Sequence, residues 1–346
     1  MNRYLFYASE LYAFAILRPL QEEIVNRGDE VAWFLEDRGR LDGYMKPEER
    51  LLETVAEVKS WNPGAVFVPG NLVPDFFPGI KVEIFHGFHA RKRPDNKGHF
   101  RIRNFFDLYC TQGPDTTGPF RELQEKYGFF EVVETGWPKM DPLFRDSPPP
   151  LNVNAEKPVI LLTSTFTPGL SAASELFETV RGLAAKGKWK WLVNFHPKMD
   201  SGVVSAYKSI QDGNLQFVET DDIIPLLKAA DIMVSDTSSV ISEFLLQIRP
   251  VVTFKNRAPG PHLIDIQRPE ELEPAIEHGL RRPRKLIAEI TEYADRIHPY
   301  RDGRSSHRVL SAADSLAKRG CFHLKKKPLN LLRRLKMRKR LGYYRL

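Results

Sequence analysis

Short apolar runs alternate with amphipathic stretches along most of the chain. In the N-terminal part, strand-like runs lie at residues 4–8, 30–35, 65–70, 81–87 and 106–113. The clearest helical pattern between them is "LRPLQEEIVNRG", residues 17–28, which closes on a glycine suited to a helix C-cap. This alternation predicts a parallel sheet covered by helices.

A proline-rich stretch interrupts the alternation. Residues 141–158, "DPLFRDSPPPLNVNAEKP", contain three consecutive prolines, which neither a helix nor a central strand tolerates. The alternation restarts after it, with apolar runs at 159–166, 190–197, 215–220 and 231–235 and helical patterns at 171–186 and 223–230. We therefore expect an α/β chain of two doubly wound, Rossmann-like domains, residues 1–145 and 155–317, which face each other across a cleft.

Composition narrows the class of protein. The chain of 346 residues is 42% hydrophobic, which is enough for a large core. No apolar run approaches the roughly 20 residues that a membrane-spanning helix needs, and Glu10 interrupts the apolar start, so neither a span nor a signal peptide is predicted. We expect a cytoplasmic protein. Cys110 and Cys321 form no disulfide framework, and no carboxylate pair or His/Cys cluster has metal-site spacing, so we expect no metal and no cofactor.

The positive charge is concentrated at the C-terminus. The net charge is +7, but residues 318–346 hold 12 of the 51 Lys and Arg residues and no Asp or Glu, so residues 1–317 carry a net charge of −5. This split argues against a nucleic-acid-binding protein and indicates a mildly acidic body with a basic tail.

A polar cluster follows one of the expected strands. In "VSDTSSVISEFLLQIRPVVTF", residues 234–254, Asp236, Ser238 and Ser239 stand between an apolar run and a helical pattern. Ligands of doubly wound domains bind at the carboxyl ends of strands, and a helix N-terminus there suits phosphate. The simpler interpretation is that Asp236 or Ser238 caps the helix.

Two further stretches place histidine and cationic residues after expected strands. "NFHPK" puts His196 and Lys198 after a strand of the second domain, and "IFHGFHARKR" puts His86, Arg91 and Lys92 after a strand of the first. A single histidine is more often structural than catalytic. Two of them at strand ends in different domains, each beside cations, favour a phosphate-handling site in the cleft.

Six motifs occur in the order typical of one enzyme family. The motifs are "HG" at 86–87, "TGWPKMD" at 135–141, "VILLTSTF" at 159–166, "HPK" at 196–198, "LLKAADIMVSDTSSVISEFLLQIRPVVTF" at 226–254 and "DGRSSHRV" at 302–309. Through them the chain resembles the CDP-glycerol glycerophosphotransferase family, which includes teichoic acid primases and polymerases with the two-domain GT-B fold.

The resemblance implies transfer of glycerol phosphate, or a related alditol phosphate, from a CDP-linked donor to a hydroxyl of a lipid-linked or glycan acceptor in the cell envelope. It implies that His86 is the general base. The remaining roles it implies are donor phosphate binding by His196, Lys198, Ser238 and Ser239, nucleotide binding by Thr165, Asp236 and Glu243, and acceptor or phosphate contacts by Arg91, Lys92 and Lys139.

Two positions depart from the family pattern, and one segment of the family is missing. Arg91 stands where the family often has Lys, and Thr237 stands where it often has Tyr. A guanidinium binds oxyanions as a fork and an ammonium as a point charge, so Arg91 affects acceptor geometry. The chain has no large N-terminal extension like that of the long polymerases, so we expect a single-addition enzyme.

Three other functions fit parts of the sequence. A UDP-GlcNAc 2-epimerase shares the overall fold, but "DTSS" lacks the two glycines of its strand-to-helix turn. A glycosyltransferase that uses a nucleotide sugar for surface polysaccharide is the better alternative, because the same cleft could hold a sugar. A non-catalytic scaffold or nucleic-acid binder is disfavoured by the charge split and by the lack of a recognisable nucleic-acid-binding motif.

The basic tail suggests a membrane surface as partner. Leu331, Leu332 and Leu335 share one side of a helical wheel, but Lys339 falls within that side, so the apolar face is short. Electrostatic attraction must then provide most of the binding to anionic lipid. We expect a cytoplasmic enzyme that associates peripherally with the inner face of the membrane through residues 318–346.

Overall fold

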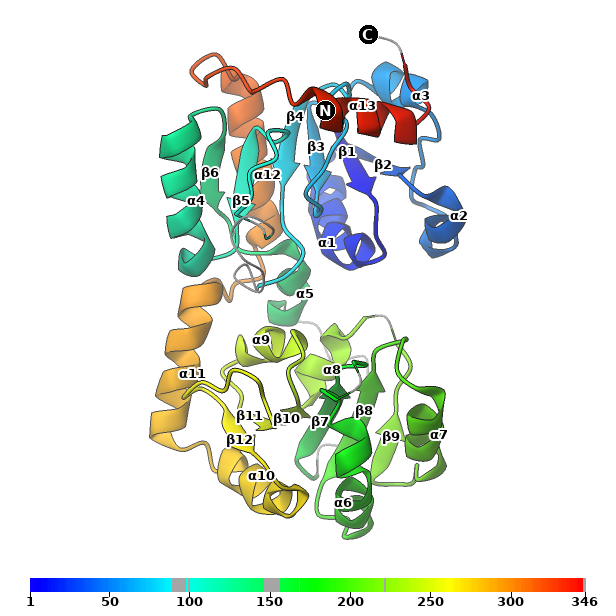
Figure 1. The fold of residues 1–346 in the computed structure, drawn as a ribbon, viewed down its shortest axis with the longest axis vertical. Helices are drawn as coiled ribbons and strands as arrows, with labels where there is room; N and C mark the ends of the chain where they lie inside the picture. Colours follow the sequence, from blue (N-terminus) through cyan, green and yellow to red (C-terminus); the bar gives the residue numbers. More distant parts are fainter. Residues whose placement is uncertain (89–97, 99, 146–155, 168, 221, 345–346) are drawn as a thin grey trace. The chain divides into compact units, whose positions relative to one another are not determined.

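The computed structural model describes residues 1–88, 98, 100–145, 156–167, 169–220 and 222–344. Within these ranges the chain forms two six-stranded, entirely parallel sheets in two compact units (Figure 1). Unit 1 comprises Met1–Arg145 and Arg296–Leu346, and unit 2 comprises Asp146–Asp295. The predicted α/β class with two doubly wound sheets is confirmed.

Sheet 1, in unit 1, has the strand order β2-β1-β3-β4-β5-β6, so the chain changes direction across the sheet between β1 and β3. The strands are β1 (Arg3–Ala8), β2 (Glu30–Leu35), β3 (Ala65–Val68), β4 (Ile80–Glu83), β5 (Leu108–Thr111) and β6 (Glu131–Glu134). The helices are α1 (Tyr12–Asn26), α2 (Arg38–Leu41), α3 (Val55–Trp61), α4 (Pro114–Tyr127), α5 (Asp141–Phe144), α12 (Ser305–Arg319) and α13 (Leu331–Arg340), with the 3-10 turns η1 (Asp42–Tyr44) and η2 (Pro138–Met140).

Sheet 2, in unit 2, has the order β12-β11-β10-β7-β8-β9, with the change of direction between β7 and β10. Its strands are β7 (Val159–Ser164), β8 (Lys190–Phe195), β9 (Leu215–Phe217), β10 (Ile232–Ser235), β11 (Val251–Phe254) and β12 (Ile264–Ile266). Its helices are α6 (Ala173–Ala185), α7 (Ser201–Ser209), α8 (Ile224–Ala229), α9 (Val240–Leu245), α10 (Leu272–Leu280) and α11 (Arg284–Ile297), with the 3-10 turn η3 (Pro269–Glu271).

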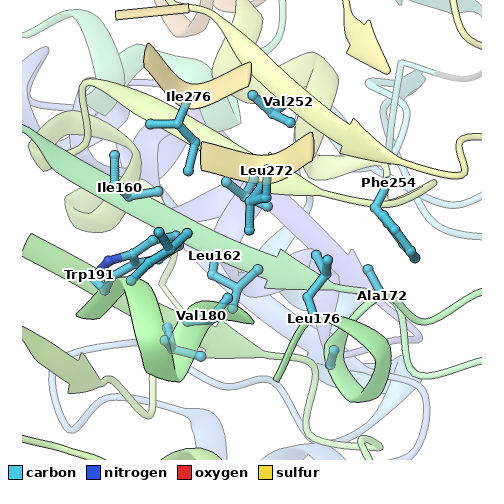
Figure 2. Packing of buried hydrophobic residues seen from close by; sticks show 14 of the residues in the cluster. Ile160, Leu162, Ala172, Leu176, Val180, Trp191, Val252, Phe254, Leu272 and Ile276 are labelled. Carbon is cyan, nitrogen blue, oxygen red and sulfur yellow. The ribbon is translucent and has the colours of Figure 1, made fainter. Parts of the chain in front are cut away.

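The core of unit 2 explains why its central strand has no polar alternation. All six residues of β7 are buried, because helices cover both faces of a parallel sheet. On one face, Ile160 and Leu162 lie between α6 and α10 (Figure 2). The side chains that meet them there are Leu176, Val180, Trp191, Val252, Leu272 and Ile276.

Helix α12 belongs to unit 1, which corrects the sequence-based assignment of residues 296–317 to the second domain. The helix packs against α1 and against β3, β4 and β5 of sheet 1. Its apolar stripe, which includes Val309 and Ala313, is fully buried, and the Tyr4 hydroxyl donates a hydrogen bond of 2.6 Å to Asp314. The order of elements along the chain did not reveal this return to the first sheet.

The basic tail is folded onto the other face of sheet 1 and is not a separate appendage. The connection between β3 and β4, residues 69–79, contains no helix, so α13 occupies part of the layer that a crossover helix would fill (Figure 1). Met337 is 4% exposed, with its sulfur 3.7 Å from the Tyr7 hydroxyl. Tyr343 stacks on Phe76 with ring centres 4.7 Å apart.

Ion pairs fix the orientation of the tail on unit 1. They join Lys327 to Asp107 at 2.5 Å, Arg338 to Asp75 at 3.5 Å, and Arg340 to Glu36. Glu36 and Asp75 are largely buried carboxylates, so these pairs are better shielded from solvent than ordinary surface pairs. Part of the positive charge of the tail is therefore neutralised by carboxylates of unit 1.

We predict that Met337→Ala lowers the free energy of unfolding by about 2 to 5 kcal/mol, because it removes a buried side chain that joins α13 to the sheet. The control is Leu335→Ala, because Leu335 lies on the same helix but is 60% exposed. Denaturant unfolding, followed by fluorescence, measures both variants. Equal stability of the two variants would show that α13 does not contribute to the fold.

Candidate functional site

Polar side chains follow four adjacent strands of sheet 2 at its carboxyl edge. Thr165 follows β7, His196 follows β8, Asp236 follows β10 and Asn256 lies just beyond β11. The strand order places β10 beside β7, where the chain changes direction. Doubly wound domains bind their ligands at this position, so the edge is the candidate ligand site of unit 2.

Asp236 organises this edge from within the protein. The residue is fully buried, and its carboxylate accepts hydrogen bonds from the Ser164 hydroxyl at 2.6 Å and from the backbone N–H groups of Thr165 at 2.9 Å and Ala172 at 3.2 Å. Its other oxygen accepts from the N–H of Thr237 at 2.6 Å. These bonds offset the cost of burying the charge and connect the loop after β7 to the turn after β10. Asp236 thus fixes the backbone around the site from a buried position.

The turn that follows presents two serines. Ser239 is exposed and Ser238 half-buried, and Ser239 is the N-cap residue of α9 without making a side-chain capping bond. The N-cap of α9 is therefore neither Asp236 nor Ser238, the two residues that the capping interpretation names. Helix α9 starts at Val240 and has only six residues, while Glu243 lies in its first turn and is buried. The side chain of Ser239 is therefore exposed at this edge of sheet 2, and that of Ser238 is partly exposed.

His196 is exposed, and its tautomer is set by the backbone. Its Nδ1 accepts a hydrogen bond from the N–H of Lys198 at 3.0 Å, so the proton of the neutral ring lies on Nε2. Partial burial and then the charge of Lys198 lower the pKa of His196, which favours this neutral form. Phe166, from the loop after β7, lies 4.6 Å from the imidazole between ring centres. His196 can therefore donate from Nε2 to an anionic ligand.

In unit 1, a strained turn places His86 at the carboxyl edge of sheet 1. Phe85, two residues after β4, is buried with a φ of 58°, a left-handed conformation that is costly for a bulky residue. The Trp137 indole N–H donates to the Phe85 carbonyl at 3.3 Å and supports this backbone. Strain that is held in place by the surrounding structure is frequent at functional sites.

The ring of His86 lies near the point where the strand order of sheet 1 reverses, between β1 and β3. Its Nδ1–H donates to the carbonyl of Pro69, just after β3, at 2.9 Å. The ring stacks on Tyr12, at the start of α1, with ring centres 5.0 Å apart. Burial, followed by the charges of Glu10 and Glu83, raises the pKa of Tyr12 to about 12, so its hydroxyl stays protonated.

The two histidines therefore keep their ring protons on opposite nitrogens. A carbonyl partner requires Nδ1–H in His86 and leaves the lone pair on Nε2, which is the form of a general base. A backbone N–H partner requires the reverse in His196 and makes Nε2 a hydrogen-bond donor. The two sites are thus suited to different chemical tasks.

The remaining predicted site residues fall into three groups. Lys139 lies in η2, half-buried, with its ammonium 5.3 Å from the centre of the Trp137 ring. Lys198 lies beside Phe166, with its ammonium 5.8 Å from the ring centre. Arg91 and Lys92 lie outside the described residues.

Sequence reasoning missed Tyr12, Phe85 and Asn256. The helix pattern was recognised only from residue 17, whereas α1 begins at Tyr12 and so carries this ring to the sheet edge. The left-handed conformation of Phe85 has no sequence signal, because such turns usually use glycine or asparagine. The only sequence signal for Asn256 is its position after an apolar run.

The described ranges contain no group of three or more His, Cys, Asp and Glu side chains that could hold a metal ion. None of their helices combines the length and apolar composition that crossing a bilayer requires.

The fold is of the GT-B type. A variant of the wall teichoic acid polymerase TagF aligns with a TM-score of 0.67 at 13% identity, covering 92% of this chain and 89% of that chain. A putative UDP-N-acetylglucosamine 2-epimerase from Listeria monocytogenes aligns at 0.66 and 15%, covering 92% and 97%. The S. aureus MnaA-UDP structure aligns at 0.62 and 16%, covering 95% and 99%. These identities establish the fold alone.

The resemblance to one family comes from the sequence. The model of the family described as CDP-Glycerol:Poly(glycerophosphate) glycerophosphotransferase matches residues 121–258, which include β7, β8, β10 and α9. The predicted resemblance to this family is confirmed, and the chain is a transferase. No curated protein matches the chain at a significant level.

We predict that changing both Ser238 and Ser239 to Ala weakens CDP binding at least about tenfold, because a lost hydrogen bond to a charged group costs about 1.5 to 3 kcal/mol. Calorimetric titration of the folded variant measures the effect. Ser205→Ala is the control, because Ser205 is an exposed serine on α7 of the same unit. Unchanged CDP affinity in the double variant would place the phosphate site elsewhere.

Proposed function

We propose that this transferase moves glycerol phosphate, or a related alditol phosphate, from a CDP-linked donor to a hydroxyl of a cell-envelope glycan or lipid-linked acceptor, with release of CMP. The observation that carries the proposal is the pair of histidines with opposite tautomers, each at the carboxyl edge of its own sheet. The family match supports the donor class, and a TagF structure soaked with CDPG shares the fold.

The donor is assigned to unit 2. The Nε2–H of His196, the ammonium of Lys198 and the hydroxyls of Ser238 and Ser239 supply donors and positive charge for the pyrophosphate oxygens. Such groups stabilise charge on transferring phosphoryl groups when they are held in place beforehand. The carboxylate of Asp236 holds the backbone of Thr165 at the same edge of sheet 2. We assign Thr165 to contact with the nucleotide.

The acceptor is assigned to unit 1, where His86 is the general base. In the proposed reaction the acceptor oxygen attacks the β-phosphorus of the donor, and its proton passes to Nε2 of His86. The bond from the β-phosphorus to the bridging oxygen breaks, and CMP leaves with that oxygen. The stacked Tyr12 and the Pro69 carbonyl keep the ring in the tautomer that the base requires.

We predict that the chain binds CDP-glycerol or CDP-ribitol in preference to UDP- and GDP-sugars, and that it releases CMP when an acceptor is supplied. His86→Ala should keep donor affinity within a few-fold but lower turnover about 10² to 10⁴-fold, because it removes a positioned base. Calorimetry measures the binding, and product analysis measures the turnover. His278→Ala, an exposed histidine on α10, is the control.

Two results would contradict this assignment. Turnover of His86→Ala close to that of the unchanged chain would remove His86 as the base. Selective binding of a UDP-sugar would favour the alternative, a glycosyltransferase that uses a nucleotide sugar for surface polysaccharide.

We further propose that the outer side of α13 associates with the anionic inner surface of the membrane. The tail is fixed to unit 1 through Met337 and its ion pairs, and its other side carries apolar side chains. Leu332 is 77% exposed and Leu335 60%, and both lie among lysines. The exposed leucines and lysines of α13 are Leu331, Leu332, Leu335, Lys336 and Lys339. Apolar area and basic charge together suit anionic lipid.

We predict that changing Leu332 and Leu335 to Glu abolishes co-sedimentation with phosphatidylglycerol liposomes at low salt. Deleting the whole tail would be a poor test, because the deletion would also remove the buried Met337. Val25→Glu, an exposed apolar position on α1, is the matched control. Binding of the unchanged chain should fade as salt screens the lysines. Equal co-sedimentation of the double variant and the control would rule out this surface.

A further inference from the structure

The segment after β11 is attached to the serine turn by two hydrogen bonds. The side-chain amide of Asn256 donates to the backbone carbonyl of Asp236 at 2.6 Å. The backbone N–H of Arg257 donates to the hydroxyl of Thr237 at 3.4 Å. The segment therefore runs beside the residues that lead into Ser238 and Ser239.

Asn256 is held in this orientation from its other side. The carboxylate of Asp265 accepts from the Asn256 N–H at 3.0 Å and from the Thr253 hydroxyl at 2.7 Å. The Asn256 side-chain oxygen accepts from the N–H of Ala258 at 2.9 Å. An amide that is bonded through both its nitrogen and its oxygen has one orientation, so it fixes the carbonyl to which it donates.

The backbone before Asn256 is strained. Lys255 has a φ of 50°, and its ammonium pairs with Glu175 of α6 at 2.5 Å. Left-handed backbone at a non-glycine residue persists only where the surroundings enforce it. The strain turns the chain at the end of β11, so that the next two residues lie against the turn after β10.

Arg257 is exposed at this place. Its backbone lies within hydrogen-bond distance of Thr237, one residue from Ser238. From this backbone position, the guanidinium of Arg257 would have to extend toward the two serines to add a charged fork to their hydroxyls. Guanidinium groups match phosphate oxygens in pairs, which single hydroxyls cannot do.

We propose that residues 255–257 form a third phosphate-binding element of unit 2, in which Arg257 contacts the β-phosphate of the donor and Asn256 is the positioning residue for the turn that carries Ser238 and Ser239. The proposal rests on the proposed function only in placing the pyrophosphate at this edge. It adds a specificity for nucleoside diphosphates over monophosphates, since the guanidinium would meet the phosphate that a monophosphate lacks.

The experiment titrates the full chain and its variants with a nucleoside diphosphate and the matching monophosphate. CDP and CMP are used if the unchanged chain binds CDP, and UDP and UMP if it binds UDP instead. Arg257→Ala should weaken the diphosphate at least about tenfold and the monophosphate by less than threefold, while Arg257→Lys should recover part of the loss. Arg268→Ala, an exposed arginine elsewhere in unit 2, is the control.

Asn256→Ala is tested in a double-mutant cycle with the Ser238 and Ser239 alanine variant. If Asn256 acts through the turn, its effect on diphosphate affinity should largely disappear once both hydroxyls are gone, whereas a general loss of structure would add to it. The unfolding midpoint of Asn256→Ala is measured in parallel.

The outcomes separate the two proposals. Diphosphate binding that is unchanged in Arg257→Ala overturns the third element and leaves the proposed function intact. Additive effects of Asn256→Ala and the serine variant overturn the positioning role. An unchanged chain that binds neither CDP nor UDP overturns both the element and the proposed function.

Discussion

The ligand edge of unit 2 depends on one buried carboxylate. Removing an ionised aspartate from water costs several kcal/mol unless hydrogen bonds replace the lost hydration. Asp236 has four such donors, three of which are backbone N–H groups, and one of these belongs to Ala172 at the start of α6. The partial positive charge of a helix N-terminus also stabilises an anion there. Because these donors come from the loop after β7 and the turn after β10, the charge fixes the geometry of both sides of the switch point.

The same logic, with different chemistry, operates in unit 1. There the fixed elements are a left-handed Phe85, an indole that supports its carbonyl, and a proline carbonyl that sets the tautomer of His86. Each unit thus uses buried, non-reacting groups to orient one imidazole, and the choice of backbone partner decides whether that imidazole accepts or donates. A substitution of either histidine by a residue of similar size would lose this choice even if it kept the shape.

Sequence reasoning found the elements whose burial is local. The run at 159–166 became β7, and the run at 231–235 became β10, because central strands of parallel sheets are continuously apolar. The predicted residues Thr165, His196 and Asp236 do lie at the edge of sheet 2, because the end of an apolar run also predicts the end of its strand. That Asp236 faces inward was not predictable, because its donors include Ala172, 64 residues away along the chain. For the same reason α12 was assigned to the wrong unit: its apolar stripe shows that it packs, but not on which sheet.

The tail shows why the number of charges in a sequence segment overstates the charge that this segment exposes on the protein surface. Its basic residues read as one cationic segment, yet Arg338, Arg340 and Lys327 are paired with carboxylates of unit 1 that lie far away in the sequence. The helix that carries Arg338 and Arg340 leaves Leu331, Leu332 and Leu335 exposed. The fold thereby divides one basic run into an inner set, which pairs with carboxylates of unit 1, and an outer set, which stays exposed. The orientation of α13, rather than the total charge, determines which cations belong to each set.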